Sequence, residues 1–208
     1  MIPLGHVITV VDHDLSPIQF LIMDSPTETT LPHYLDAFHR YNVTTVVRCC
    51  QPTYNADILL DNQIDFLDLP FRDGGIPNNM IINEWIDLID KYAQYPYRPP
   101  TTTTMKPAIA VHCVAGLGRA PVLVALALIE FGMAPLDAVA YVREKRRGAF
   151  NKPQIHFLDQ YKPTTKHYRR HYSSSSSFSS GSSSVFSWGG RIMLKLTNKV
   201  HPPTVAQQ

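Results

Sequence analysis

A short glycine-containing loop carries the residue types in this chain that are best suited to chemistry. It reads HCVAGLGR over residues 112–119 and holds a thiol, Cys113, and a guanidinium, Arg119. A thiolate is a strong nucleophile, and a guanidinium can donate two parallel hydrogen bonds to a phosphate group. We therefore expect Cys113 to attack a phosphate ester that Arg119 binds.

The segments on either side of this loop predict a strand followed by a helix. Residues 108–111 are a short apolar run typical of a buried strand, and residues 121–129 are an apolar run that opens with proline, which is favoured in the first turn of a helix. The loop then ends at a helix N-terminus, whose free N–H groups and dipole attract anions and favour a thiolate. The candidate phosphate-binding residues are Val114, Ala115, Gly116, Leu117, Gly118 and Arg119.

The specificity of this signal comes from the whole string. The spacing of Cys113 and Arg119 alone is weak, whereas the strand, both glycines and the arginine together are hard to explain as a buried structural cysteine beside a turn. We expect the adjacent His112 to orient the loop by hydrogen bonding rather than to act as an acid or base.

Apolar periodicity along the rest of the chain predicts an α/β fold. The expected strands are residues 18–23, 43–48, 64–69 and 108–111, and the expected helices are residues 31–38, 80–92, 121–129 and 154–161. Strands that alternate with helices form a mostly parallel central sheet flanked by helices on both faces. Ligands of such sheets bind at the carboxyl ends of the strands, where the loop at 112–119 would lie.

Three separated motifs resemble one family. The run HCVAGLGRAPVLVALALIEFGM at residues 112–133, with KRRGAFN at 145–151 and VVRCCQPTY at 46–54, resembles the phosphatases of regenerating liver, the prenylated type IVA protein tyrosine phosphatases. The resemblance implies the cysteine-phosphatase fold and a reaction in two steps. Cys113 forms a phosphocysteine, and water then hydrolyses it. It implies no cofactor, and the dispersed histidines predict no metal site.

The same resemblance assigns a general acid. The segment LPFRDGG at residues 69–75 is similar to the family's mobile acid loop, which places Asp73 in that role. Asp68 is the alternative, although its place at the end of a predicted strand favours a structural role. Leu69 stands where the family usually has tryptophan and Arg72 where it usually has aspartate, and both differences bear on how the loop closes.

Ala120 predicts a slow second step. Most cysteine phosphatases carry a serine or threonine directly after the loop arginine, and its hydroxyl hydrogen-bonds the sulfur as it leaves. Alanine cannot donate that bond, and loss of one such donor costs about 100- to 1000-fold in rate. We expect phosphocysteine to accumulate.

The loop side chains also indicate the class of substrate. The residues between Cys113 and Arg119 include no extra lysine of the kind found in inositol-lipid phosphatases. This favours phosphotyrosine, phosphoserine or phosphothreonine in proteins, bound in a shallow apolar pocket. The family also binds CBS-pair domains of magnesium-transport mediators through its catalytic face, so a binding module is the alternative function. A rhodanese-like or arsenate-reducing thiol enzyme is a third, less favoured alternative function.

The cysteines suggest redox control. The chain has three cysteines, and the N-terminus shows no secretory signal, which predicts a reducing compartment. By the resemblance, Cys50 is the resolving cysteine that pairs reversibly with Cys113. Cys49 is the competitor, because neighbouring strand residues point to opposite faces and only one of the two should reach the site.

Charge and composition divide the chain into three parts. The net charge is +2, but the basic residues concentrate in the C-terminal third. We expect a phosphatase domain at residues 1–165, a polybasic segment at 166–172 and a disordered Ser-rich tail at 173–208. The basic run at 145–147 is interpreted as a solvated helix end.

The C-terminus departs from the resembling family. No cysteine follows Cys113, so the prenylated Cys-a-a-X box is missing and the chain ends TVAQQ at residues 204–208. We expect a cytoplasmic location, with the nucleus as an alternative, and only weak electrostatic membrane attraction. No motif favours nucleic-acid binding, and a homo-oligomer remains an open alternative.

Overall fold

The computed structural model describes residues 8–94 and 105–164. These lie in the first of two units into which the chain divides, residues 1–176 and 177–208. The predicted polybasic segment and Ser-rich tail lie outside the described residues. Within the described part, no helix has the length and apolar character needed to cross a membrane.

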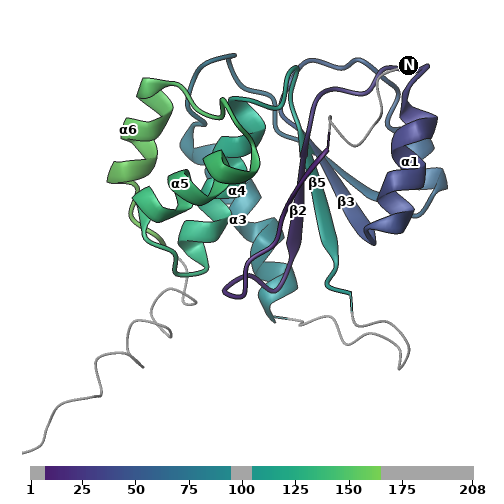
Figure 1. The fold of residues 1–208 in the computed structure, drawn as a ribbon. Coiled ribbons are helices and arrows are strands. Elements are labelled where there is room, and N and C mark those ends of the chain that lie inside the picture. Colours follow the sequence, from purple (N-terminus) through teal and green to yellow (C-terminus); the bar gives the residue numbers. More distant parts are fainter. Residues whose placement is uncertain (1–7, 95–104, 165–208) are drawn as a thin grey trace, which may run out of the picture. The chain divides into compact units, whose positions relative to one another are not determined.

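A five-stranded sheet forms the centre of the described unit (Figure 1). Its strands are β1 (Thr9–Val11), β2 (Gln19–Met23), β3 (Val43–Arg48), β4 (Asp65–Asp68) and β5 (Ala108–His112). They lie in the order β1-β2-β5-β3-β4, and all neighbours are parallel except β1 and β2. The predicted mostly parallel sheet is therefore confirmed.

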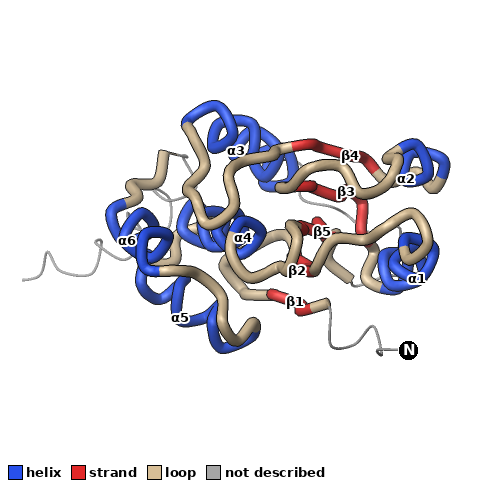
Figure 2. The backbone as a smooth tube through the Cα atoms, turned by 90° about the horizontal axis from the view of Figure 1, so that it is seen from above, coloured by secondary structure: helices blue, strands red, loops and turns tan. Residues whose placement is uncertain are grey.

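Helices cover both faces of this sheet. They are α1 (Leu31–Arg40), α2 (Asp57–Asp61), α3 (Asn79–Gln94), α4 (Arg119–Glu130), α5 (Pro135–Lys145) and α6 (Lys152–Gln160). Figure 2 shows α1 and α2 on one side of the sheet and the other four on the opposite side. Each side has its own apolar core, and the larger core contains Trp85 and almost all of α4.

The centre of the sheet positions the loop that sequence analysis singled out. Every residue of β5 and of α4 is buried, including the polar His112, Arg119 and Glu130. The Trp85 indole donates a hydrogen bond of 2.8 Å to the Leu123 carbonyl, which fixes α3 against α4. The residues that join β5 to α4 are thus held between two rigid elements.

Two short elements were not predicted, and only the C-terminal end of α5 was. β1 and α2 have three and five residues, too few for a periodic pattern to emerge. In α5 the buried positions are only Ala138, Val139 and Val142, so its apolar stripe is narrow. The predicted α6 began two residues too late, since Asn151 and Gln154 form a capping box at its N-terminus.

Candidate active site

The nucleophile loop, residues 112–119, turns its carbonyl groups outward into the surrounding protein. The Val114 carbonyl accepts from the Ser25 amide at 3.1 Å, and the Leu117 carbonyl accepts from the Phe150 amide at 2.8 Å. The carbonyls of residues 115 and 116 accept from the Arg146 guanidinium at 3.0 and 3.2 Å. Successive carbonyls turned outward leave the amides on the concave side of the loop, as in an anion-binding nest.

Arg146 corrects one prediction from the sequence. The expected helix end at 145–147 is confirmed, since α5 ends at Lys145, but Arg146 is not simply solvated. Its side chain leaves the end of α5 and also donates to Thr9 Oγ1 in β1 at 3.2 Å. A guanidinium can reach several carbonyls at once because its donors form a planar fork. Arg146 therefore holds the nucleophile loop in place through hydrogen bonds to its outward-facing carbonyls.

Gly116 is required by the shape of this loop. Its φ is +66°, in the left-handed region, and a Cβ atom there would lie 2.5 Å from the Met23 carbonyl oxygen and 2.8 Å from the Arg146 side chain. Any side chain would thus strain the backbone and push away the groups that hold it.

The inner side of the loop is suited to an oxyanion. No hydrogen bond within residues 8–94 and 105–164 uses an amide of residues 114–118 as its donor. In the same part of the chain, the buried Nε of Arg119 also has no partner. These donors lie at the N-terminus of α4, where the helix dipole adds positive potential. An unpaired buried donor is costly unless a ligand satisfies it, and a phosphate oxygen would do so.

Arg119 also connects the nucleophile loop to the acid loop, residues 69–75. Its Nη1 donates to the carbonyls of Cys49 and Phe71, both at 3.2 Å. Its Nη2 lies 3.2 Å from Asp73 Oδ1, although the Asp73 side chain is 81% exposed. The structure therefore places Asp73 beside Arg119, the residue that ends the nucleophile loop, with Asp73 open to solvent.

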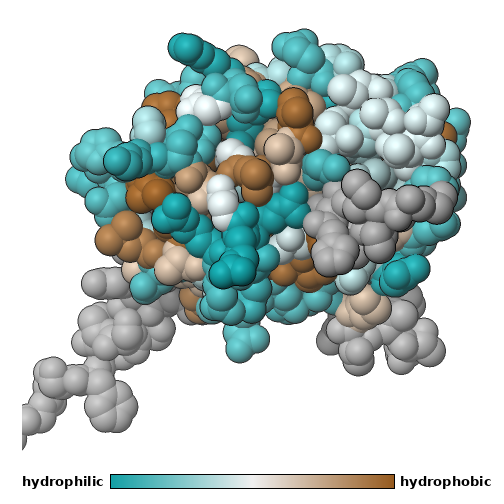
Figure 3. Space-filling view, turned by 45° about the horizontal axis from the view of Figure 1, so that its top comes forward, coloured by the Kyte–Doolittle hydropathy of each residue, from teal (hydrophilic) through white to brown (hydrophobic). Residues whose placement is uncertain are grey.

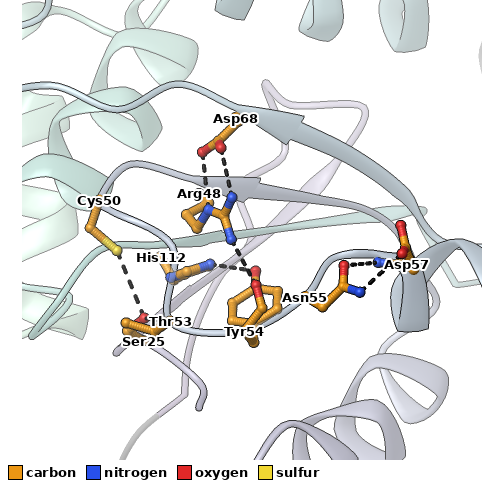
Figure 4. A network of polar contacts seen from close by, with 9 residues as sticks. All are labelled: Ser25, Arg48, Cys50, Thr53, Tyr54, Asn55, Asp57, Asp68 and His112. Carbon is orange, nitrogen blue, oxygen red and sulfur yellow. Dashed lines mark hydrogen bonds and ion pairs between the residues drawn. The ribbon is translucent and has the colours of Figure 1, made fainter. Parts of the chain in front are cut away.

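Asp68, the alternative acid, has a different partner. Its two carboxylate oxygens accept from Nε and Nη2 of Arg48 at 3.0 and 2.7 Å, as Figure 4 shows. Arg48 is 5% exposed and lies over the Tyr54 and Phe66 rings. Asp68 thus neutralises a buried guanidinium, in agreement with the structural role predicted for it.

His112 lies beneath the nucleophile loop in the same network. Its Nε2 is 2.7 Å from the Tyr54 hydroxyl (Figure 4). Burial, reinforced by the nearby charge of Arg48, lowers the pKa of His112 from 6.5 to about 3. A neutral, buried imidazole can hold the end of β5 in place but cannot supply a proton at neutral pH. This geometry supports an orienting role.

Two residues that sequence reasoning missed connect the acid loop to α6. Asn151 Nδ2 donates to the Gly74 carbonyl at 2.8 Å, and Gln154 Nε2 donates to the Gly75 carbonyl at 2.9 Å. Gln154 is fully buried, and its amide would lie 3.3 Å from a Cβ atom on Gly118. The Asn-x-x-Gln spacing of a capping box was the available signal. It indicated a helix start, not a contact with a distant loop.

Two positions, Leu69 and Arg72, differ from the family that the sequence resembles, and a third, Ala120, differs from most cysteine phosphatases. The structure shows the surroundings of each. Leu69 is 2% exposed and packs in the larger core, and its amide donates to the Arg48 carbonyl at 2.8 Å. Arg72 is exposed, and its carbonyl accepts from the Gly75 amide in a turn. Neither difference prevents the contact between the Asp73 carboxylate and the Arg119 guanidinium. Ala120 is fully buried in the first turn of α4.

Both additional cysteines lie close to the site. Cys49 is fully buried, and burial raises the pKa of its thiol well above the ordinary value. Cys50 is 2% exposed, its sulfur lies 3.7 Å from Ser25 Oγ, and burial likewise raises its pKa. All three thiols are free. The pairing of Cys113 with Cys50 or Cys49 stays a prediction. Among the described residues, no group of three or more His, Cys, Asp or Glu side chains could hold a metal ion.

Curated relatives share most of this chain. It is 47% identical over 162 residues to the PRL-1 phosphatase of Drosophila melanogaster, covering 76% of this chain and 87% of the relative. It is 44% identical over 147 residues to protein tyrosine phosphatase type IVA 3 of Homo sapiens, covering 70% and 80%. No family model matches the chain.

Solved structures show the same fold. A protein tyrosine phosphatase from Leishmania major aligns with a TM-score of 0.64 and 41% identity, covering 74% of this chain and 98% of that one. Kinase associated phosphatase aligns with a TM-score of 0.54 and 16% identity, covering 73% and 90%. The second likeness concerns the fold alone. The α/β cysteine-phosphatase fold expected from the sequence is confirmed.

Proposed function

Because this chain belongs to the PRL, or type IVA, family of protein tyrosine phosphatases, we propose that it dephosphorylates proteins with Cys113, Arg119 and Asp73 as its catalytic residues. The observation that carries this proposal is the loop whose carbonyls at residues 114–117 are turned outward, while its amides at 114–118 and Arg119 Nε have no acceptor among the described residues. A phosphate group bound there would place its phosphorus beside the Cys113 sulfur.

In the first step the Cys113 thiolate attacks phosphorus. An S–P bond forms, and the bond between phosphorus and the leaving oxygen breaks. Asp73, as a carboxylic acid, gives its proton to that oxygen. Its exposure and its 3.2 Å contact with Arg119 fit a group that reaches over a bound phosphate from solvent. The loop amides and Arg119 stabilise the charge on the remaining phosphoryl oxygens.

In the second step water attacks the phosphocysteine. Asp73, now a carboxylate, takes a proton from the water, the S–P bond breaks, and the thiolate and inorganic phosphate are released. Ala120 has no hydroxyl to stabilise the departing sulfur, so this step is the slower one.

The role of Asp73 as the acid has a characteristic test. We expect Asp73→Asn to lower kcat/KM for a phosphotyrosyl peptide by about 100-fold, because general acid catalysis contributes roughly that much. The loss should be much smaller for 4-nitrophenyl phosphate, whose leaving group needs no proton. Asp68→Asn serves as the control and should not change the ratio between the two substrates. Equal losses on both substrates for Asp73→Asn would refute the assignment.

Redox control by the neighbouring thiols is a further part of the proposal. Hydrogen peroxide would oxidise two thiols to one disulfide and be reduced to two waters, which protects Cys113 from over-oxidation. Peptide mapping after mild peroxide treatment should find Cys113 joined to Cys50. A bridge to Cys49 would make Cys49 the resolving thiol. The absence of any disulfide to Cys113 would refute redox control by these thiols.

A second candidate function is protein binding by the same face. Val114 is 60% exposed and Leu117 is 40% exposed, so the rim of the site presents apolar side chains. By the family resemblance, the proposed partners are CBS-pair domains of magnesium-transport mediators. Binding that persists in Cys113→Ser, together with negligible turnover by the wild type, would make this the main role. We also propose, from the sequence alone, that the protein is cytoplasmic, that it is weakly attracted to membranes and that it forms a homo-oligomer.

A further inference from the structure

A groove lies beside the acid loop, and we propose that it binds an apolar side chain of the phosphorylated protein, a few residues away from the phosphorylated one. The groove has a volume of about 400 Å³. Gly74, Gly75 and Ile76 form one wall, and Pro153, His156 and Phe157 of α6 form the other. This inference rests on the proposed function and specifies the substrate segment that the site would accept.

One wall of the groove begins directly after the proposed acid, Asp73. Gly74 directly follows Asp73, whose carboxylate is 3.2 Å from Arg119. An extended peptide advances about 3.3 Å per residue. We expect a side chain two or three residues from the phosphorylated residue to reach the groove.

The wall of the groove is held in place. The carbonyls of Gly74 and Gly75 are bound by the side chains of Asn151 and Gln154 at 2.8 and 2.9 Å. These polar groups are therefore satisfied and do not need a ligand. The space beside Gly74 is open, because a Cβ atom there would meet only the Asn151 amide, at 3.4 Å.

The lining selects an apolar occupant. The polar side chains of the lining are His156 and Gln160, and no lining residue is acidic, a lysine or an arginine. Ile76 is 49% exposed, and Phe157 is partly buried against the core. Figure 3 shows hydrophobic residues in brown near the middle of this face and on the side that carries α6 in Figure 1. Covering such surface with a leucine or similar side chain is favourable.

The occupant is the substrate because a substrate must already cross this face. A phosphorylated side chain that enters the nucleophile loop brings its neighbouring residues close to the acid loop, and Val114, Leu117 and Ile76 are all at least 40% exposed to meet them. A second copy of the chain, or residues 165–208 of the same chain, would have to compete with it.

The test uses the full chain and a series of phosphotyrosyl peptides in which a single leucine moves along a serine-glycine sequence on either side of the phosphotyrosine. We expect one leucine position to raise kcat/KM by about 10-fold over the peptide without leucine, which corresponds to about 1.4 kcal/mol. Ile76→Ser should reduce this preference to less than about 3-fold while hydrolysis of 4-nitrophenyl phosphate stays unchanged. Leu136→Ser is the matched control, since Leu136 is 56% exposed and does not line the groove. It should keep the preference.

The outcomes separate this inference from the proposed function. If the wild type hydrolyses 4-nitrophenyl phosphate, and hydrolyses all the peptides with the same kcat/KM, the groove assignment is wrong and the proposed function stands. If it hydrolyses neither, the proposed function fails and this inference fails with it. A molecular mass that doubles with concentration in the wild type but not in Ile76→Ser would assign the groove to a second copy. A photo-crosslinker at position 76 that captures residues 165–208 in the presence of peptide would assign it to the chain's own C-terminal segment.

Discussion

At the scale of single residues, Gly116 determines whether the nucleophile loop can form. Two separate effects act against any larger residue there, the left-handed φ and the 2.5 Å approach to the Met23 carbonyl oxygen. Gly148 offers a comparison, because its φ is +84° but a Cβ atom would meet only Leu117, at 3.9 Å. The pair can therefore separate backbone strain from steric clash.

We predict that Gly116→Ala is more damaging than Gly148→Ala. Left-handed strain alone should lower the free energy of unfolding by about 1–2 kcal/mol for each variant. Gly116→Ala should lose more than that, because the backbone of β2 must move, and its kcat/KM should fall by at least about 100-fold. Urea unfolding and steady-state kinetics measure both quantities. Equal effects of the two substitutions would mean that the close approach to Met23 is not a constraint.

His112 predicts a pH dependence of stability. The folded protein holds it neutral with a pKa of about 3, whereas the unfolded chain protonates it below about pH 6.5. Between these values the unfolded state binds more protons, so stability is complete above pH 6.5 and is lost as the pH falls toward 3. His112 should lower the free energy of unfolding by about 2 kcal/mol between pH 7 and pH 5.

The control for this prediction is His112→Gln, which is neutral at every pH. Between pH 7 and pH 5, the free energy of unfolding of His112→Gln, measured in urea, should fall by about 2 kcal/mol less than that of the wild type. The same change in both proteins would show that His112 does not carry the dependence.

At the scale of elements, α6 positions the acid loop. Asn151 performs two tasks with one side chain, since its oxygen caps α6 and its Nδ2 donates to the Gly74 carbonyl. Gln154 likewise completes the capping box and donates to Gly75. The start of one helix is therefore coupled to a loop that lies far away in the sequence.

Asn151→Asp should separate these two tasks. The aspartate oxygen can still cap the helix, so the free energy of unfolding should stay within about 0.5 kcal/mol of the wild type. The donor to Gly74 is lost, so the acid loop should be less well placed and kcat for a phosphotyrosyl peptide should fall by about 10-fold. Asn151→Ala, which also loses the cap, should be less stable by about 1 kcal/mol. Unchanged peptide turnover in Asn151→Asp would show that this hydrogen bond does not position Asp73.

At the scale of the whole described unit, the sequence was sufficient for what depends on local pattern. The buried strand and helix around HCVAGLGR and the mostly parallel sheet follow from apolar runs and short motifs, whereas Asp73 was assigned through the family resemblance. Arg146 and Gln154 could not be found this way, because their roles depend on contacts between elements that are distant in the sequence. Nor does local pattern show that Arg48 would take Asp68 as its partner.

In the proposed mechanism Cys113 forms a covalent phosphoryl intermediate whose hydrolysis is slow because residue 120 is alanine. Rapid-quench kinetics with 4-nitrophenyl phosphate would detect this intermediate. We predict a burst of nitrophenolate equal to the enzyme concentration, then slow turnover, and one added phosphoryl group by intact mass. Cys113→Ser should give no burst, and Ala120→Ser should raise the slow rate by about 100-fold, the contribution of one transition-state donor. Steady turnover without a burst or an added phosphoryl group, or an unchanged slow rate in Ala120→Ser, would contradict the account.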